Sequence, residues 1–247
     1  MIVTIDGPAG SGKSSAARML AEELGFIHLN SGAIFRAIGV AAQEQGVPLD
    51  DEAALEQVGR RMKFSFYDQN TKMSGIFVDG VDWGQLILTE DAGKVASRIA
   101  VFQRVRDVAA ELQRNAGQNG NIVVEGRDAG SVIFPDADFK FYLDASVDVR
   151  ARRRLRQLES ATVTLEPIRQ KVDSIGQDFD SVHGDFDSIR RDIAERDLRD
   201  STRTIAPQTC PKDALRIDTS DISLAEVVAK MVAVVESFEL NDVQSGV

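Results

Sequence analysis

Residues 2–15 read IVTIDGPAGSGKSS, and this stretch decides the fold. A short apolar run with β-branched residues leads into the motif G-x-x-x-x-G-K-S, whose fixed positions are Gly7, Gly12, Lys13 and Ser14. Glycines allow backbone N–H groups to wrap around phosphate oxygens, and a helix that begins after the loop adds the positive end of its dipole. The stretch therefore predicts a strand, a phosphate-binding loop and a helix, in that order.

The rest of the chain alternates short apolar runs with helical patterns. Runs that favour strands lie at 2–5, 26–29, 122–124, 139–143 and 214–217. Patterns that favour helices lie at 13–24, 33–45, 102–115, 147–158 and 224–235. Because strands that alternate with helices form a parallel sheet covered on both faces, we expect an α/β fold with a doubly wound, five-stranded parallel sheet.

Two stretches do not fit this alternation. Residues 62–84 alternate with period two around an Asp79-Gly80 turn, which predicts a small antiparallel insert. Residues 159–200 carry no strand signal and are helical and charged. The sheet is therefore expected to carry two additions, one of mixed structure and one of helices.

The composition excludes several classes of protein. A net charge of −10 argues against a surface for nucleic acid or an anionic membrane, which needs a basic face. No apolar run approaches the roughly 18 residues of a membrane span. The first residues lack the basic region and cleavage site of a signal peptide, and Cys210 is the single cysteine. We expect a cytoplasmic enzyme without a disulfide.

Arginines cluster where strands are predicted to end and helices to begin. They occur in NSGAIFR (30–36), RVR (104–106), GRD (126–128), RARRRLR (150–156) and RDLRDSTR (196–203). Transfer of a phosphoryl group to another phosphate requires many fixed positive donors, because its catalysis is mostly positioning and charge neutralisation. A GTPase would carry a guanine-reading N-K-x-D element, and PKDA at 211–214 matches it poorly. The arginines therefore favour a phosphotransferase.

These stretches together resemble the bacterial cytidylate kinases, which belong to the nucleoside monophosphate kinases. The resemblance rests on residues 7–15, 30–36, 95–106, 125–137, 196–207 and 213–221, which occur in the order typical of the family. It implies transfer of a phosphoryl group from ATP to CMP or dCMP with Mg²⁺, in pyrimidine nucleotide metabolism. It also implies a P-loop kinase core at 1–34, 99–149 and 201–247, a nucleotide-binding insert at 35–98 and a helical lid at 150–200.

The family resemblance assigns the donor side to the loop and to the lid. The residues expected to hold ATP are Gly7, Pro8, Ala9, Gly10, Ser11, Gly12, Lys13, Ser14 and Ser15. In such loops the lysine reaches the β- and γ-phosphates, and the hydroxyl of the next residue, here Ser14, ligates Mg²⁺. The expected catalytic residues are Lys13, Arg127, Arg150, Arg153 and Arg154. Because a helix turns its side chains in different directions, two or three lid arginines are expected to reach the phosphoryl group.

The same resemblance assigns the acceptor side. The expected substrate-binding residues are Ser31, Arg36, Ser97, Arg106, Arg127, Asp128, Arg196, Asp200 and Arg203. Arg36 and Arg127 would hold the CMP phosphate, and Arg196 with Asp200 would hold the sugar, with Arg203 nearby. The cytosine pocket would consist of Ser31, Ser97, Arg106 and Asp128. For Glu125 two interpretations remain open: an acid that orders Mg²⁺-bound water, and a simple loop or cap residue.

The chain departs from the family pattern at two places. Asn30 and Phe35 occupy positions where Asp and Tyr are expected, so an acid beside the phosphates is missing. The lid is also longer than expected by about three heptads. Its apolar positions follow the spacing of a heptad seam: Leu165, Ile168, Val172, Ile175, Phe179, Val182, Phe186, Ile189 and Ile193. A helix beginning at Pro167 would carry this seam to Ile193, unless Gly176 or Gly184 breaks it.

The extra heptads leave a choice of partner for the apolar seam. We expect a monomer whose own domain covers the seam, with dimerisation through 165–193 as the alternative. Removal of residues 173–193 is then expected to leave activity within about tenfold of wild type. Two other functions stay open: a different P-loop phosphotransferase, and a nucleotide-gated interaction protein that works through the heptads. The full set of arginines argues against the second.

Overall fold

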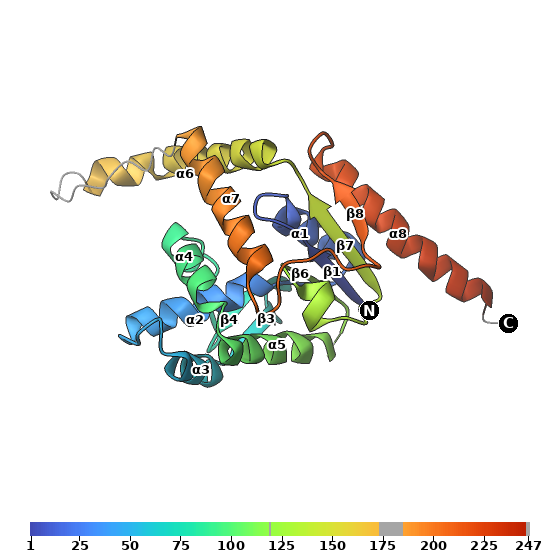
Figure 1. Cartoon of the computed structure of the whole chain (residues 1–247). Coiled ribbons are helices and arrows are strands. Elements are labelled where there is room, and N and C mark those ends of the chain that lie inside the picture. Colours follow the sequence, from blue (N-terminus) through green and yellow to red (C-terminus); the bar gives the residue numbers. More distant parts are fainter. Residues whose placement is uncertain (119, 173–184, 246–247) are drawn as a thin grey trace.

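A five-stranded parallel sheet organises the structure, a computed structural model that describes residues 1–118, 120–172 and 185–245 (Figure 1). The strand order is β2-β6-β1-β7-β8, and every neighbouring pair is parallel. The strands are β1 (Ile2–Asp6), β2 (Ile27–Asn30), β6 (Ile122–Gly126), β7 (Phe139–Asp144) and β8 (Leu215–Asp218). The five predicted strands and the α/β fold class are thus confirmed. Because β1 is the central strand, the loop that follows it lies at the middle of the carboxyl edge of the sheet.

Alternate side chains of the strands point to opposite faces of the sheet. Val123 belongs to a core with α1 (Lys13–Leu24) and α8 (Leu224–Ser245), whereas Ile122 and Val124 belong to a core on the other face. Figure 1 shows α8 on one side of the sheet and α2, α3 and α5 on the other. A strand buried on both faces needs a continuous apolar run, which explains the pattern that predicted it.

The predicted insert contains an antiparallel sheet and helices. Its elements are α2 (Ser31–Glu44), α3 (Glu52–Arg61), β3 (Phe64–Asp68), β4 (Met73–Val78), β5 (Val81–Asp82) and α4 (Glu90–Ile99), followed by α5 (Gln103–Gln118). Asp79 and Gly80 have φ of 51° and 81°, so the predicted turn has the left-handed backbone of a tight hairpin. Helices α2 and α4 approach closely, because a Cβ at Gly39 would lie 2.4 Å from Val95 Cγ1. The insert shares one apolar core with α5 and β6.

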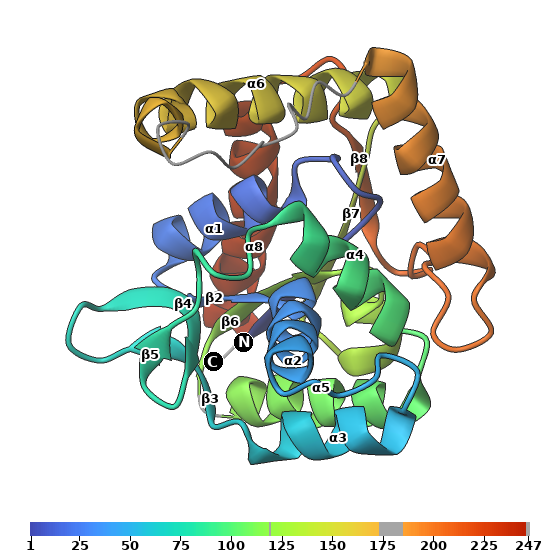
Figure 2. The same ribbon diagram turned by 90° about the vertical axis from the view of Figure 1, so that its left-hand side faces the viewer.

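Two helices form the lid region. Helix α6 (Val147–Val172) and α7 (Phe186–Thr202) pack through Ala151, Ile189 and Ile193, with Phe186 partly buried beside them. Figure 2 shows α6 spanning the molecule above α1, with α7 running down beside the first turns of α6. The described end of the apolar seam, from Phe186 to Ile193, is therefore covered by the same chain.

The prediction that a helix begins at Pro167 is wrong. Helix α6 begins at Val147 and continues through Pro167 to Val172. A proline inside a helix removes one backbone hydrogen bond, but the turns already formed before it carry the helix past that position. Gly176 and Gly184 lie outside the described residues. Within the described residues, no helix is both long and apolar enough to cross a membrane.

Candidate active site

The loop between β1 and α1 has a backbone that depends on glycine. Gly7, Gly10 and Gly12 have φ of 146°, 77° and 93°, a region that residues with a side chain rarely adopt. A Cβ at Gly7 would lie 2.0 Å from the carbonyl oxygen of Leu143 in β7. Gly12 ends the loop as the residue before the first turn of α1. The expected phosphate-binding loop is therefore present, with its amide-rich end at the start of a helix.

Lys13 is the first residue of α1 and directly follows this loop. Its Nζ donates to the carbonyl oxygen of Pro8 at 2.6 Å, and the residue is 6% exposed. Burial lowers the pKa of Lys13 well below its ordinary value, and the nearby positive charge of Arg127 lowers it further, whereas Glu125 acts in the opposite direction. An anion bound to the loop would raise the pKa of Lys13 again and favour the charged amine, as expected for a lysine that binds phosphate.

Ser14 and Glu125 form a pair at the junction of the loop and β6. The Ser14 hydroxyl donates to Glu125 Oε2 at 2.8 Å, and His28 Nε2 lies 3.7 Å from Oε1. Burial alone would raise the pKa of Glu125, but His28, Lys13 and Ser14 outweigh it and lower the pKa below its ordinary value. Among the described residues, Glu125 Oε1 is buried and has no hydrogen-bond partner. An ionised carboxylate with a free oxygen beside a hydroxyl is a donor set that suits Mg²⁺.

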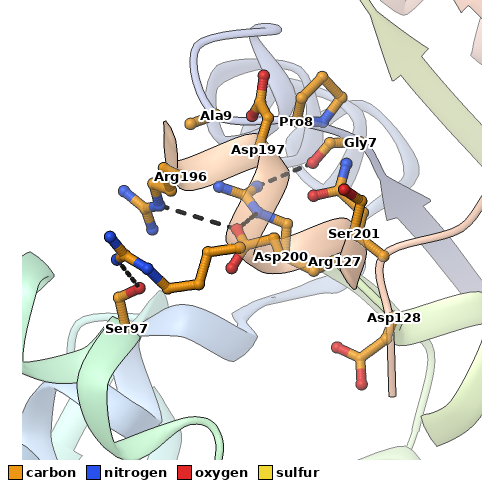
Figure 3. Close-up of polar contacts among 12 residues, drawn as sticks. Gly7, Pro8, Ala9, Ser97, Arg127, Asp128, Arg196, Asp197, Asp200 and Ser201 are labelled. Atoms are coloured by element: carbon orange, nitrogen blue, oxygen red, sulfur yellow. Dashed lines mark hydrogen bonds and ion pairs between the residues drawn. The ribbon is translucent and has the colours of Figure 1, made fainter. Parts of the chain in front are cut away.

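Arg127 connects the loop to the lid, as Figure 3 shows. Its Nε donates to Asp200 Oδ2 at 3.0 Å, and its Nη1 donates to the carbonyl oxygen of Gly7 at 2.8 Å. The expected partner of Asp200, Arg196, has its Nε 3.9 Å from the same carboxylate oxygen. Burial lowers the pKa of Arg196 to about 10, and the charge of Arg127 adds to this effect. Arg196 of α7 and Arg127, which directly follows β6, thus meet at the carboxylate of Asp200.

A second cluster surrounds Asp128. Arg106 Nη2 pairs with Asp128 Oδ2, and Arg203 Nη2 lies 3.6 Å from Asp128 Oδ1. Both partners of the first pair are buried, and the guanidinium of Arg106 lies 5.8 Å from the centre of the Phe35 ring. A phenyl ring supplies this cation–π contact as well as the expected tyrosine would. The structure therefore brings Arg106 and Asp128 together as expected, and Arg203, which was expected beside Arg196 and Asp200, also lies next to Asp128.

The remaining expected acceptor residues come from α2 and α4. Ser97 Oγ accepts from Arg199 Nη1 at 3.1 Å, an arginine of α7 that the sequence did not single out. Ser31 is buried at the start of α2. Burial lowers the pKa of Arg36, and the charges of Glu125, Arg127 and Arg154 also act on it. Ser31 lies beside the end of β6, because a Cβ at Gly126 would lie 3.4 Å from Ser31 Cβ, whereas Ser97 contacts α7.

Asn30, the first departure from the expected pattern, caps α2. Its Oδ1 accepts from the backbone N–H of Ala33 at 3.0 Å, so an amide oxygen performs the capping that a carboxylate oxygen would also provide. The substitution therefore keeps the helix start in place. It removes one negative charge beside the loop.

The three lid arginines point to different places. Arg150 Nε donates to Ala145 O at 2.9 Å, and its Nη1 donates to Ala9 O at 3.0 Å. Arg153 Nη1 donates to Thr219 Oγ1 at 3.0 Å, near the carboxyl end of β8. Arg154 is half-buried, and its charge acts on Arg36. The structure thus places Arg150 and Arg153 on protein carbonyls and hydroxyls around the loop, and Arg154 is close enough for its charge to lower the pKa of Arg36.

The comparisons with known proteins agree with this geometry. A model of the cytidylate kinase family matches residues 3–181 and 169–237. The chain belongs to the cytidylate kinase family. It is 39% identical over 244 residues to a cytidylate kinase of Actinobacillus succinogenes, covering 96% of this chain and 99% of that one. It is 36% identical to cytidylate kinase 1 of Haemophilus influenzae over 98% of this chain and 97% of the relative.

A solved structure shares the fold at a much lower identity. An uncharacterized protein from Eubacterium ventriosum aligns with a TM-score of 0.50 and 13% identity, over 96% of this chain and 98% of that one. At this identity the likeness concerns the fold alone.

Sequence reasoning missed Asp6, which joins the donor and acceptor sides. Its two carboxylate oxygens accept from the backbone N–H groups of Ala129 at 2.8 Å and Gly130 at 2.7 Å. These residues begin η1 (Ala129–Ile133), a turn of π-helix that directly follows Asp128. Burial raises the pKa of Asp6 to about 6, although the two N–H groups act in the opposite direction. The only local signal is an acid at the end of an apolar strand.

Proposed function

We propose that this chain transfers the terminal phosphoryl group of ATP to CMP and dCMP, giving ADP with CDP or dCDP. The observation that carries the proposal is the buried pair of Arg106 and Asp128, which adjoins the phosphate-binding arginine Arg127. A carboxylate beside a guanidinium matches the exocyclic amine and the carbonyl oxygen of cytosine. The relatives in the cytidylate kinase family support the same reaction.

On the donor side, the loop amides and Lys13 would hold the ATP phosphates. Ser14 and Glu125 fit a magnesium ion, Ser14 through its hydroxyl and Glu125 through water, and a bound Mg²⁺ would neutralise charge on the phosphates. Among the residues whose side chains the structure describes, no group of three or more His, Cys, Asp or Glu side chains could hold a metal.

On the acceptor side, each part of CMP meets a different set of residues. Asp128 would accept from the cytosine amine and Arg106 would donate to the ring carbonyl, with Ser31 and Ser97 at the edge of the pocket. Arg36 and Arg127 would hold the phosphate, because planar guanidinium groups suit phosphate oxygens. The remaining substrate-binding residues belong to the lid region. Arg196, Asp200 and Arg203 would hold the sugar and the adjoining edge of the nucleotide.

The reaction needs no general base. A nucleotide phosphate is ionised at neutral pH, so one of its oxygens attacks the terminal phosphorus of ATP once the two are held in line. The bond from that phosphorus to the bridging oxygen of ATP breaks, and ADP leaves with the electron pair. Lys13, Arg127 and Arg154 would balance the charge on the transferred group. Closure of the lid over the site would exclude water and limit hydrolysis of ATP.

The proposed substrates indicate where the enzyme works in the cell. ATP and CMP are metabolites of the cytoplasm, so we place the enzyme there. The packing of Phe186, Ile189 and Ile193 on α6 of the same chain supports a monomer as the active form.

Steady-state kinetics with the full chain test this proposal. CMP, dCMP, UMP and AMP are compared as acceptors, with ADP formation as the measurement. CMP and dCMP should exceed UMP in kcat/KM by at least about tenfold, because Asp128 would face a carbonyl oxygen of uracil instead of an amine. Faster turnover of AMP than of CMP would point instead to a different nucleotide kinase.

A further inference from the structure

Helix α7 contacts the phosphate-binding loop through two parallel bridges. Asp197 Oδ2 lies 2.6 Å from Arg150 Nη1, which also donates to Ala9 O. Asp200 Oδ2 accepts from Arg127 Nε at 3.0 Å, and Arg127 also donates to Gly7 O. In both bridges an acid of α7 binds an arginine that binds a loop carbonyl. Figure 3 shows Asp197 and Asp200 on one helix, beside the loop.

The two bridges have the same arrangement of an aspartate, an arginine and a loop carbonyl. Residues three apart on a helix lie on the same face, so Asp197 and Asp200 present their carboxylates in the same direction. The two carbonyl groups that complete the bridges belong to the same loop and lie two positions apart, at Gly7 and Ala9. The bridge through Arg127 includes expected substrate residues. The bridge through Asp197 includes a residue to which neither the sequence nor the proposed function assigns a role.

We infer that Asp197 is a positioning residue for the phosphoryl transfer proposed above, on which this inference rests. Asp197 holds the acceptor-binding helix α7 in register with the donor loop through Arg150 and Ala9. A guanidinium with several donors in one rigid plane transmits position from the loop to the helix better than a flexible ammonium. Arg196 and Asp200, on either side of Asp197 in α7, are thereby set at a fixed distance from the bound ATP.

The ion pair of Asp197 with Arg150 does not have the features of a contact that only stabilises the fold. Among the described residues, its second oxygen, Oδ1, is buried without a hydrogen-bond partner, which is unfavourable for folding. The contact between α6 and α7 is already made by Ala151, Ile189 and Ile193. Arg150 is already bound to Ala145 O and Ala9 O. What the Asp197 carboxylate adds is a second link from the loop to the helix, at Ala9, beside the link through Arg127 and Asp200 at Gly7.

This link predicts that the two substrates assist each other in binding. A triphosphate that fixes the loop would fix Ala9 and Arg150, and through Asp197 it would favour the position of α7 that binds CMP. Such coupling is reciprocal, and its typical size is about 5- to 150-fold in affinity. Asp197→Asn keeps the size of the side chain but removes the charge that pairs with Arg150.

The test measures the dissociation constant of CMP by calorimetry, with and without saturating Mg²⁺ and the non-hydrolysable ATP analogue AMP-PNP. In wild type the analogue should tighten CMP binding at least about fivefold. In Asp197→Asn this gain should fall below about twofold. Asp192→Asn removes an exposed acid from the same helix and should keep the gain of wild type. A gain in Asp197→Asn equal to that of wild type, or no gain in wild type, would overturn the inference.

A second measurement on wild type does not depend on a folded variant. Hydrogen–deuterium exchange is followed in α7 with AMP-PNP and Mg²⁺ alone, without CMP. The inference predicts slower exchange of the amides around Asp197, and unchanged exchange there would contradict it. Failure of wild type to phosphorylate CMP would reject the proposed function, whereas an active wild type with unaltered coupling in Asp197→Asn rejects the inference alone.

Discussion

The donor loop and the acceptor cluster solve the same problem, holding a phosphate, in different ways. The loop is one uninterrupted stretch, 7–15, and it offers backbone N–H groups at a helix start. The acceptor cluster draws charged side chains from α2, α5, α7 and the residues that directly follow β6. The loop is shaped by the positive φ angles of its glycines, and the cluster is shaped by ion pairs such as Arg106 with Asp128.

This difference determines which mutations each region tolerates. A loop that works through its backbone is sensitive to any added Cβ where φ is positive, whatever the charge of the new residue. A cluster that works through buried charges is sensitive to the loss of one partner, because the other charge is left unpaired. The two regions should therefore fail separately when each is damaged.

The largest loss of activity is expected from Gly7→Ala, which distorts the backbone of the loop without changing its charge. The new Cβ would lie 2.0 Å from Leu143 O, so the loop must shift away from β7. The kcat/KM for ATP should fall by at least about 10³-fold, because several phosphate donors move together. Kinetics with varied ATP measure this, alongside CMP affinity by calorimetry, which should change far less.

Gly93→Ala provides the matched control for the loop variant. Gly93 lies in α4, and a Cβ there would meet nothing within 4 Å. Alanine is also the better helix former, so this variant should be as active as wild type and slightly more stable. Equal activity of the Gly7 and Gly93 variants would show that the loop backbone does not decide ATP binding.

The next largest effect is expected from Arg127→Met, which damages the acceptor side. Methionine keeps an unbranched side chain but removes the donors to Asp200 and to the substrate phosphate. The kcat/KM should fall about 10²-fold for CMP, dCMP and UMP alike, because the phosphate is common to all three. The three rates are compared in one assay. A loss confined to cytosine nucleotides would contradict the role of Arg127 in phosphate binding.

A smaller and more selective effect is expected from Asp128→Asn. The amide removes the carboxylate that pairs with Arg106 and would accept from the cytosine amine. The preference for CMP over UMP should shrink by about tenfold, since part of it rests on one hydrogen bond to a buried group. The ratio of the two kcat/KM values is the measurement. An unchanged ratio would mean that another residue reads the base.

The same contrast explains what could be predicted from the sequence. The five strands and the loop could be predicted because each depends on neighbouring residues, either an apolar run or a motif with fixed spacing. Arg106 and Asp128 could be placed in one cluster through the family resemblance, and the structure brings them together. The roles assigned to them remain proposals that the kinetics above can test.

What could not be predicted depends on which way a side chain turns, or on distant contacts. Arg153 and Arg154 are neighbours in α6, yet the first donates to Thr219 Oγ1, whereas the charge of the second acts on Arg36. The pairing of Asp197 with Arg150 depends on how α7 lies against α6, which the pattern of either helix leaves open. The start of α6 could not be predicted from Pro167, because a proline suits a helix start but does not exclude a helix that begins earlier.

Packing on α6 also changes the expectation for the extra heptads. Removal of residues 173–193 was expected to spare activity. That removal would also delete Ile189 and Ile193, which pack on Ala151 one residue from Arg150. The truncated chain would lose the core of the lid, so its activity no longer tests whether the added heptads are accessory.

The smallest effect concerns Asp6, the residue through which the two regions touch. Its pKa of about 6 exceeds the ordinary value of 3.8, so the folded protein holds this proton more tightly than the unfolded chain. The stabilisation from Asp6 is therefore full at low pH and is lost as the pH rises through about 6. Between pH 5 and pH 7 the loss should be about 1 kcal/mol.

Urea unfolding of wild type and Asp6→Asn at several pH values isolates this contribution. Relative to Asp6→Asn, the free energy of unfolding of wild type should fall by about 1 kcal/mol from pH 5 to pH 7, because asparagine does not titrate. Asp213→Asn is the control: Lys140 lowers the pKa of Asp213, so its titration lies below this range and the difference should stay flat. A flat difference for Asp6→Asn as well would mean that Asp6 is ionised throughout. Its two bonds to Ala129 and Gly130 would then outweigh burial, and the junction between loop and acceptor cluster would be insensitive to pH.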